Sequence, residues 1–94
     1  MIIEMDGWKE IICGDVTPEL KNHFDRALAV LPGASYQPIA LIGTQVVNGT
    51  NYKIQAIANP VGTGAKPAEV IIVINVDTSG VATLVSVDGT DIIY

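Results

Sequence analysis

The pattern of apolar and polar positions predicts one helix early in the chain. Apolar residues at positions 20, 24, 27, 28 and 31 recur at spacings of three and four, which places them on one face of a helix. Thr17 precedes this pattern as a candidate N-cap, with Pro18 at the first helical position and Glu19 in the first turn. A Pro-Gly pair at positions 32–33 ends it. We therefore expect an amphipathic helix over residues 18–31.

The rest of the chain has the pattern of β-strands. Segments rich in valine, isoleucine and threonine cover residues 36–47, 50–58, 69–76 and 81–87, and a shorter one covers residues 8–13 before the helix. Asn48-Gly49 predicts a tight hairpin, and residues 77–80 predict a second turn. Residues 59–67 are expected to be a loop. This order predicts an α+β domain, with one N-terminal helix packed on a four- to five-stranded antiparallel sheet.

The strand expected over residues 69–76 contains five consecutive apolar residues at 70–74, so both of its faces are apolar. A sheet with one solvated face alternates apolar and polar positions instead. We therefore expect the outer face or a strand edge to be covered by a tail, a loop or a second copy of the chain, as in a homodimer.

Size and charge limit the classes of function. The 94 residues and 9.9 kDa correspond to a single domain over residues 1–94. A net charge of -5 repels polyanions, so nucleic acid is not an expected partner. Every apolar stretch is shorter than the roughly 18 residues of a membrane span, and the first residues lack the basic start of a secretory signal. We expect no membrane association and a cytoplasmic location.

The chain has few residues of the types that commonly act in catalysis. Cys13, the single cysteine, follows two isoleucines and is expected to be a small buried side chain. His23, the single histidine, is expected beside the apolar stripe of the helix in a structural role. A Cys-His pair would match a cysteine nucleophile and its base, but no third orienting group is evident and the chain is too small for such a cleft. We predict no catalytic residue and no enzymatic activity.

No cofactor or metal site is expected either. Residues 62–66 contain the glycines and lysine of a phosphate-binding loop, but Pro67 and the strand after it leave no helix N-terminus to bind a phosphate. The aspartates are scattered singly, without the spacing of a calcium loop.

One motif is informative. Residues 45–52 read Gln-Val-Val-Asn-Gly-Thr-Asn-Tyr. This resembles the Gln-x-Val-x-Gly loop of cystatins, and it matches seven of the eight positions of the Gln-Val-Val-Ala-Gly-Thr-Asn-Tyr stretch seen in stefins and other cystatins. The helix before this hairpin, the strands after it and the Thr-Pro-Glu helix start are also stefin-like. Gly7 falls where the family has a glycine near the N-terminus. The chain thus resembles the cystatin superfamily, and within it the stefin-like (type 1) inhibitors of papain-like cysteine proteases.

The resemblance implies reversible, competitive inhibition of a papain-like cysteine protease. In the family, the hairpin loop and the N-terminal segment enter the active-site cleft on either side of the catalytic cysteine and offer it no peptide bond. By position, the residues implied to bind the protease are Gly7, Gln45, Val46, Val47, Asn48 and Gly49. Burial of each of the two valines contributes about 1.5 to 3 kcal/mol. A hairpin fixed in advance also loses little entropy on docking.

The chain departs from the family at three places. Residues 77–80 are small and polar where the family's second hairpin loop is bulky. Glu4 and Asp6 would bring carboxylates to a largely apolar cleft, with a desolvation cost. Asn48 replaces a small apolar residue.

Two alternatives remain open. The first is a cystatin-fold scaffold that inhibits nothing and binds another protein or itself, including a domain-swapped oligomer, because the family's hairpin loops also act as hinges for strand exchange. The second is that Asn48-Gly49 forms an ordinary hairpin turn, with Val46 and Val47 as strand ends packed on the core.

Overall fold

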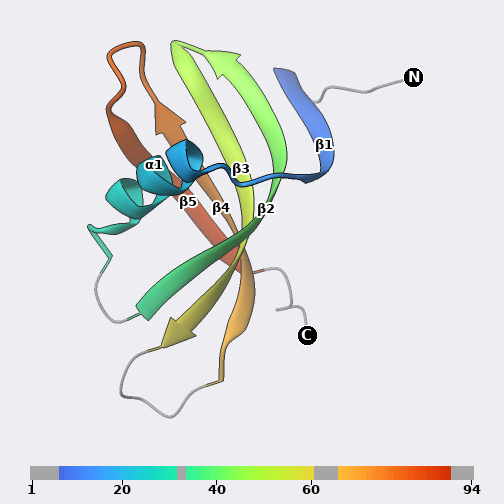
Figure 1. Ribbon diagram of the computed structural model, residues 1–94, viewed down its shortest axis with the longest axis vertical. Coiled ribbons are helices and arrows are strands. Elements are labelled where there is room, and N and C mark those ends of the chain that lie inside the picture. Colours follow the sequence, from blue (N-terminus) through green and yellow to red (C-terminus); the bar gives the residue numbers. More distant parts are fainter. Residues whose placement is uncertain (1–6, 32–33, 61–65, 90–94) are drawn as a thin grey trace.

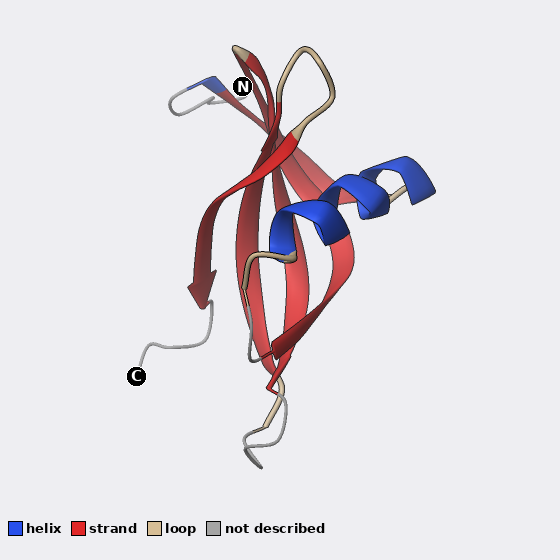
Figure 2. Ribbon diagram, turned by 90° about the vertical axis from the view of Figure 1, so that its left-hand side faces the viewer, coloured by secondary structure: helices blue, strands red, loops and turns tan. Residues whose placement is uncertain are grey.

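The fold consists of one helix on one antiparallel sheet. A computed structural model describes residues 7–31, 34–60 and 66–89 of the chain. The elements follow in the order β1 (Trp8–Gly14), α1 (Pro18–Leu28), β2 (Ala34–Val47), β3 (Gly49–Pro60), β4 (Ala68–Val76) and β5 (Ala82–Gly89). The strands pair in sequence order, and α1 crosses one face of the sheet (Figures 1 and 2). The predicted α+β class with a single helix on an antiparallel sheet is confirmed.

The start of α1 follows the sequence prediction, but its end does not. Thr17 is extended, and its Oγ1 accepts a hydrogen bond of 3.1 Å from the Leu20 amide, as an N-cap does. The helix ends at Leu28, three residues before the predicted end. The Leu31 amide donates to the carbonyl of Leu28, which is the three-residue spacing of a tightening turn. Leu31 still packs against the core, so the predicted apolar stripe is right and the predicted length is wrong.

The core lies between α1 and the middle of the sheet. The buried side chains of the helix meet those of β3 and β4, and together they form one cluster of Leu20, Phe24, Ala27, Leu28, Ile54, Ala56, Val70, Ile72 and Ile74. Within the apolar run at 70–74, residues 70, 72 and 74 therefore face the helix. Ile71 and Val73 lie on the outer face and are half-buried. Their partners on β3 are Gln55 and Lys53, whose long side chains can cover apolar surface. Covering of the outer face by another segment or chain stays a prediction.

All five strands begin and end within two residues of their predicted limits, but their irregularities were not predicted. Ile39 and Ile42 are extra residues on β2 opposite β3, and such bulges bend a strand pair, as the curved β2 and β3 of Figure 1 show. β3 continues to Pro60, so the expected loop at 59–67 is shorter, and residues 61–65 lie outside the described part. No helix in the described ranges is long and apolar enough to cross a membrane.

The prediction that Cys13 is buried is wrong. Residues 11–13 of β1 face a single residue of β2, because Glu10 pairs with Gly43 and Gly14 with Leu41. This bulge breaks the alternation of inward and outward side chains. Cys13 is exposed there, with a positive φ of 53°. Its apolar neighbour Ile12 is 89% exposed, so an apolar sequence context was no guide to burial.

Candidate functional site

Three segments meet at one end of the sheet, which we call the hairpin end: Gly7 just before β1, residues 45–49 and residues 77–80 (top of Figure 1). Trp8 pairs with Gln45, and a Cβ placed on Gly7 would lie 3.8 Å from the Cγ of Gln45. Thr50 pairs with Val76, which places the β2–β3 hairpin beside the β4–β5 turn. The structure thus brings together all the residues predicted to form the site.

The two valines of the motif are exposed. Val46 is 84% exposed and Val47 46% exposed, and Asn48 at the tip is exposed as well. Neither valine belongs to the buried core cluster. The alternative in which both are strand ends packed on the core is therefore wrong.

Gly49 is required by the geometry of the tip. Its φ is 101°, a conformation that side-chain-bearing residues rarely adopt. A Cβ at this position would collide with the carbonyl oxygen of Val76 and lie 2.7 Å from the Cα of Asp77. Asn48 does not share the positive φ, so the turn is not the mirror-image type that Asn-Gly usually forms. The hairpin is confirmed, and glycine is needed there for close packing as well as for backbone conformation.

A row of side-chain amides links three strands just behind the tip. Asn51 Nδ2 donates to Gln45 Oε1 at 2.9 Å, and Asn75 Nδ2 donates to Asn51 Oδ1 at 2.8 Å. All three side chains are half-buried, on β2, β3 and β4. Gln45, predicted to contact a protease, is thus used within the fold to hold the hairpin. Sequence reasoning missed Asn75 because only the strand register shows that it lies opposite Asn51.

The β4–β5 turn is small and polar, as predicted, and it is held by one carboxylate. Asp77 accepts hydrogen bonds from the amide of Val81 at 3.0 Å, and from the amide and hydroxyl of Ser79 at 2.9 and 2.8 Å. These bonds lower the pKa of Asp77 below its ordinary value of 3.8. The Val81 amide has the largest effect, and the Ser79 hydroxyl has the next largest. The turn therefore presents a fixed negative charge beside the Val46-Val47 tip.

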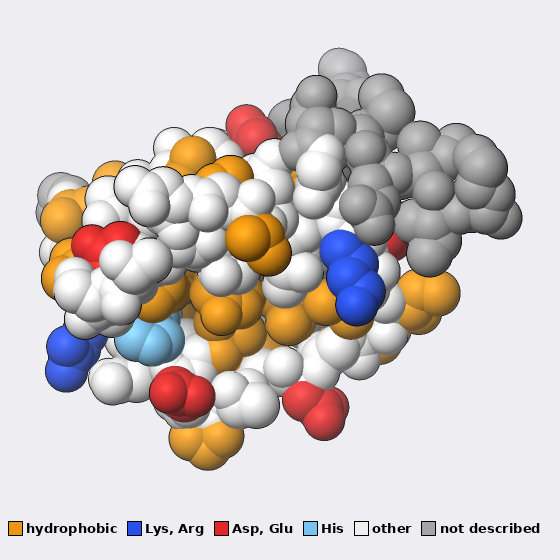
Figure 3. All heavy atoms as spheres, turned by 90° about the horizontal axis from the view of Figure 1, so that it is seen from above, with side chains coloured by type: hydrophobic (Ala, Val, Ile, Leu, Met, Phe, Trp, Pro, Cys, Tyr) orange, Lys and Arg blue, Asp and Glu red, His pale blue; other side chains and the backbone are white. Residues whose placement is uncertain are grey.

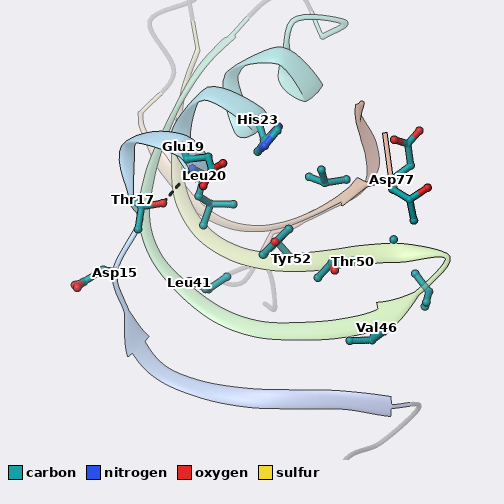
Figure 4. Close-up of a pocket in the computed structure, with 14 residues that line it drawn as sticks. Asp15, Thr17, Glu19, Leu20, His23, Leu41, Val46, Thr50, Tyr52 and Asp77 are labelled. Carbon is teal, nitrogen blue, oxygen red and sulfur yellow. Dashed lines mark hydrogen bonds between the residues drawn. The ribbon is translucent and has the colours of Figure 1, made fainter. Parts of the chain in front are cut away.

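An open groove of about 620 Å³ separates the hairpin end from the first turns of α1 (Figure 4). Apolar side chains from the helix and the sheet line it, with carboxylates at its borders. Figure 3, which looks onto this end of the molecule, shows hydrophobic side chains in the hollow, with acidic, basic and histidine side chains around it. Val46 and Val47 line the groove as well as forming the tip. Sequence reasoning missed this groove.

His23 points from α1 toward the groove (Figure 4). It is half-buried beside the apolar stripe, as predicted, and its Nδ1 is buried with no hydrogen-bond partner among the described residues. Cys13 is exposed and is not among the residues that line the groove with His23. In residues 7–31, 34–60 and 66–89, no three His, Cys, Asp or Glu side chains lie close enough together to hold a metal ion.

Comparison with models of known protein families, with characterised proteins and with solved structures finds no match to this chain.

Proposed function

We propose that the protein is a reversible, competitive inhibitor of papain-like cysteine proteases that inserts its hairpin end into the active-site cleft. The observation that carries the proposal is the exposure of Val46 and Val47 on a tip held by its neighbours. Two lines of support accompany it: the resemblance of residues 45–52 to the cystatin loop, and a helix-on-sheet topology consistent with a cystatin-like domain.

The tip has the energetic features of an inhibitor. Complete burial of a valine side chain contributes about 1.5 to 3 kcal/mol, and Val46 begins almost fully exposed. Val47, about half exposed, would contribute about half as much. The amide row behind the tip and the contact of Gly49 with the second turn fix the hairpin before binding, which reduces the entropy lost on docking.

The mechanism requires no chemistry from the inhibitor. The tip fills the cleft with valine side chains and excludes the substrate, while the protease's cysteine keeps its thiol. Gly7, adjacent to Gln45, lets the N-terminal strand approach the same cleft without a side chain. The Asp77 turn adds little apolar surface, so most of the binding energy would come from the β2–β3 hairpin.

A papain assay tests this proposal. Hydrolysis of a fluorogenic dipeptide substrate is measured with increasing protein, and we expect the apparent KM to rise while kcat stays constant. Val46→Asp removes the apolar contact and buries a charge, so the inhibition constant should rise by about 30-fold or more. Dilution of the complex should restore activity, and mass spectrometry should show an intact inhibitor.

Val30→Asp is the matched control. Val30 follows α1, is 69% exposed and does not line the groove, so the same substitution there should leave inhibition unchanged. Full papain activity in a micromolar excess of the wild-type protein would contradict the inhibitor proposal and favour the non-inhibitory scaffold.

A further inference from the structure

The groove between α1 and the hairpin end has the size and floor of a binding site. Its volume of about 620 Å³ lies within the range of roughly 300 to 1,000 Å³ typical of ligand sites. Leu20 on the helix and Leu41, Tyr52 and Val76 on the sheet form an apolar floor, which Val46 extends toward the tip (Figure 4). An apolar side chain of a ligand can be buried there.

The charged residues that line the groove are all acidic. Three acidic residues are among those that line it, Asp15, Glu19 and Asp77, and no lysine or arginine is among them. The Asp15 carboxylate is directed outward from the hollow (Figure 4). The ion pair Lys21–Asp25 on α1 is not in the groove. Asp77 stands on the second turn and Glu19 on the first turn of α1, so the negative charges border the floor from different elements (Figure 4). The surface is complementary to a cation, and the net charge of -5 attracts cations from a distance.

His23 provides unused hydrogen-bonding capacity at the same place. A buried polar atom without a partner is uncommon in folded proteins and calls for an explanation. The unpartnered Nδ1 belongs to a side chain that lines the groove, on the helix wall facing Asp77 (Figure 4). One ring nitrogen of His23 is thus left without a partner among the described residues.

We propose that the groove binds a basic, partly apolar peptide segment of a partner protein, with an apolar side chain on the floor and arginine or lysine at the carboxylates. Such a segment matches both the floor and the border, whereas a purely apolar ligand would leave the carboxylates desolvated. This inference goes beyond protease inhibition and does not require it.

The test uses a capped hexapeptide of alternating leucine and arginine. Titration into the isotopically labelled protein should shift amide resonances at Leu20, His23 and Tyr52, and calorimetry gives Kd. The same peptide with glutamate in place of arginine should bind at least about tenfold more weakly, because its charges are repelled. A peptide with serine in place of leucine should also bind more weakly, because it leaves the floor unfilled.

A charge-matched pair of variants locates the site. Asp15→Asn with Glu19→Gln removes two charges from the groove and should raise Kd about fivefold or more. Glu10→Gln with Asp88→Asn removes two exposed charges outside it and should change Kd less than about twofold. Equal weakening by both pairs, equal binding of the serine peptide, resonance shifts elsewhere or no binding at all would each overturn the proposal. No protease is present, so the outcome is separate from that of the papain assay.

Discussion

Gly49 and Gly80 both have a positive φ, at 101° and 90°, but only one of them is packed against backbone. A Cβ on Gly49 would strike Val76 and Asp77, whereas a Cβ on Gly80 would meet nothing within 4 Å. Substitutions at these two glycines therefore separate the cost of an unfavourable backbone conformation from the cost of a steric clash.

We predict that Gly49→Ala destabilises the protein far more than Gly80→Ala. The Gly80 variant bears only the strain of a left-handed conformation, about 1 kcal/mol. The Gly49 variant must also move the second turn away from the first hairpin, so its loss should reach about 3 kcal/mol. Urea unfolding of both variants measures the difference, and equal losses would show that the two hairpins do not pack as described.

Single residues could be predicted from the sequence where local rules decide their environment. The exposure of Val46 and Val47 was expected from the resemblance of residues 45–52 to the cystatin loop, whereas the Asn-Gly hairpin alone left packing on the core open. The N-cap role of Thr17 was expected from its place before a proline and an acidic residue. Cys13 could not be predicted, because its exposure depends on a bulge against β2, and the bulge is a property of two strands that are far apart in the sequence.

At the scale of elements, the stability of the β4–β5 turn should respond to acid. The pKa of Asp77 is lowered in the folded protein by hydrogen bonds from the Val81 amide and the Ser79 hydroxyl, so folding favours its ionised form. The contribution of Asp77 is therefore complete above its unfolded pKa of about 3.8 and is lost as the pH falls through the lower folded value.

We predict that Asp77→Asn is less stable than the wild type near neutral pH, and that the difference shrinks as the pH falls below 3.8. Urea unfolding at a series of pH values measures it. Ser79→Ala keeps the amide donors and should show a smaller loss in the same direction. A difference between wild type and Asp77→Asn that is independent of pH would contradict the role of the ionised carboxylate.

The elements themselves were largely predictable, and their ends and bends were not. The 3.6-residue spacing and the N-cap predicted α1, but they did not predict that the chain tightens into three-residue hydrogen bonds at residues 29–31. The apolar run at 70–74 predicted a strand with two apolar faces, which is what β4 has. The bulges at Ile39 and Ile42 were not predicted, although Pro38 and Gly43 beside them are residue types that mark bulges within strands.

At the scale of the whole molecule, the hairpin end was predictable and the groove was not. In an antiparallel sheet with strands in sequence order, the β2–β3 and β4–β5 turns must fall at one end, together with the start of β1. The groove depends instead on where α1 crosses the sheet and on how much of the sheet it leaves uncovered near the tip. No local pattern in the sequence predicts where α1 crosses the sheet.

We predict that the two proposed activities exclude each other, because Val46 and Val47 belong both to the tip and to the groove. Addition of the leucine–arginine peptide at a concentration well above its Kd should raise the apparent inhibition constant for papain by a factor of about 1 plus the ratio of peptide concentration to Kd, because only protein without bound peptide can inhibit. The leucine–glutamate peptide is the control, and papain alone with each peptide corrects for direct effects on the protease. Unchanged inhibition at saturation would contradict this prediction, because it would show that the protein can bind the peptide and the protease at the same time.

The bulges in β1 and β5 make it harder for a further strand to pair with either edge of the sheet. Both outermost strands are interrupted, β1 at residues 11–13 and β5 at Val85, an extra residue opposite β4. A sixth strand arriving at either side would find a broken row of amide and carbonyl groups, which pairs poorly. Segments as apolar and β-prone as residues 70–74 stack into fibrils when their strands are free to pair. Here that segment lies in β4, paired with β3 on one side and β5 on the other, so its backbone groups become free to stack only if the chain opens.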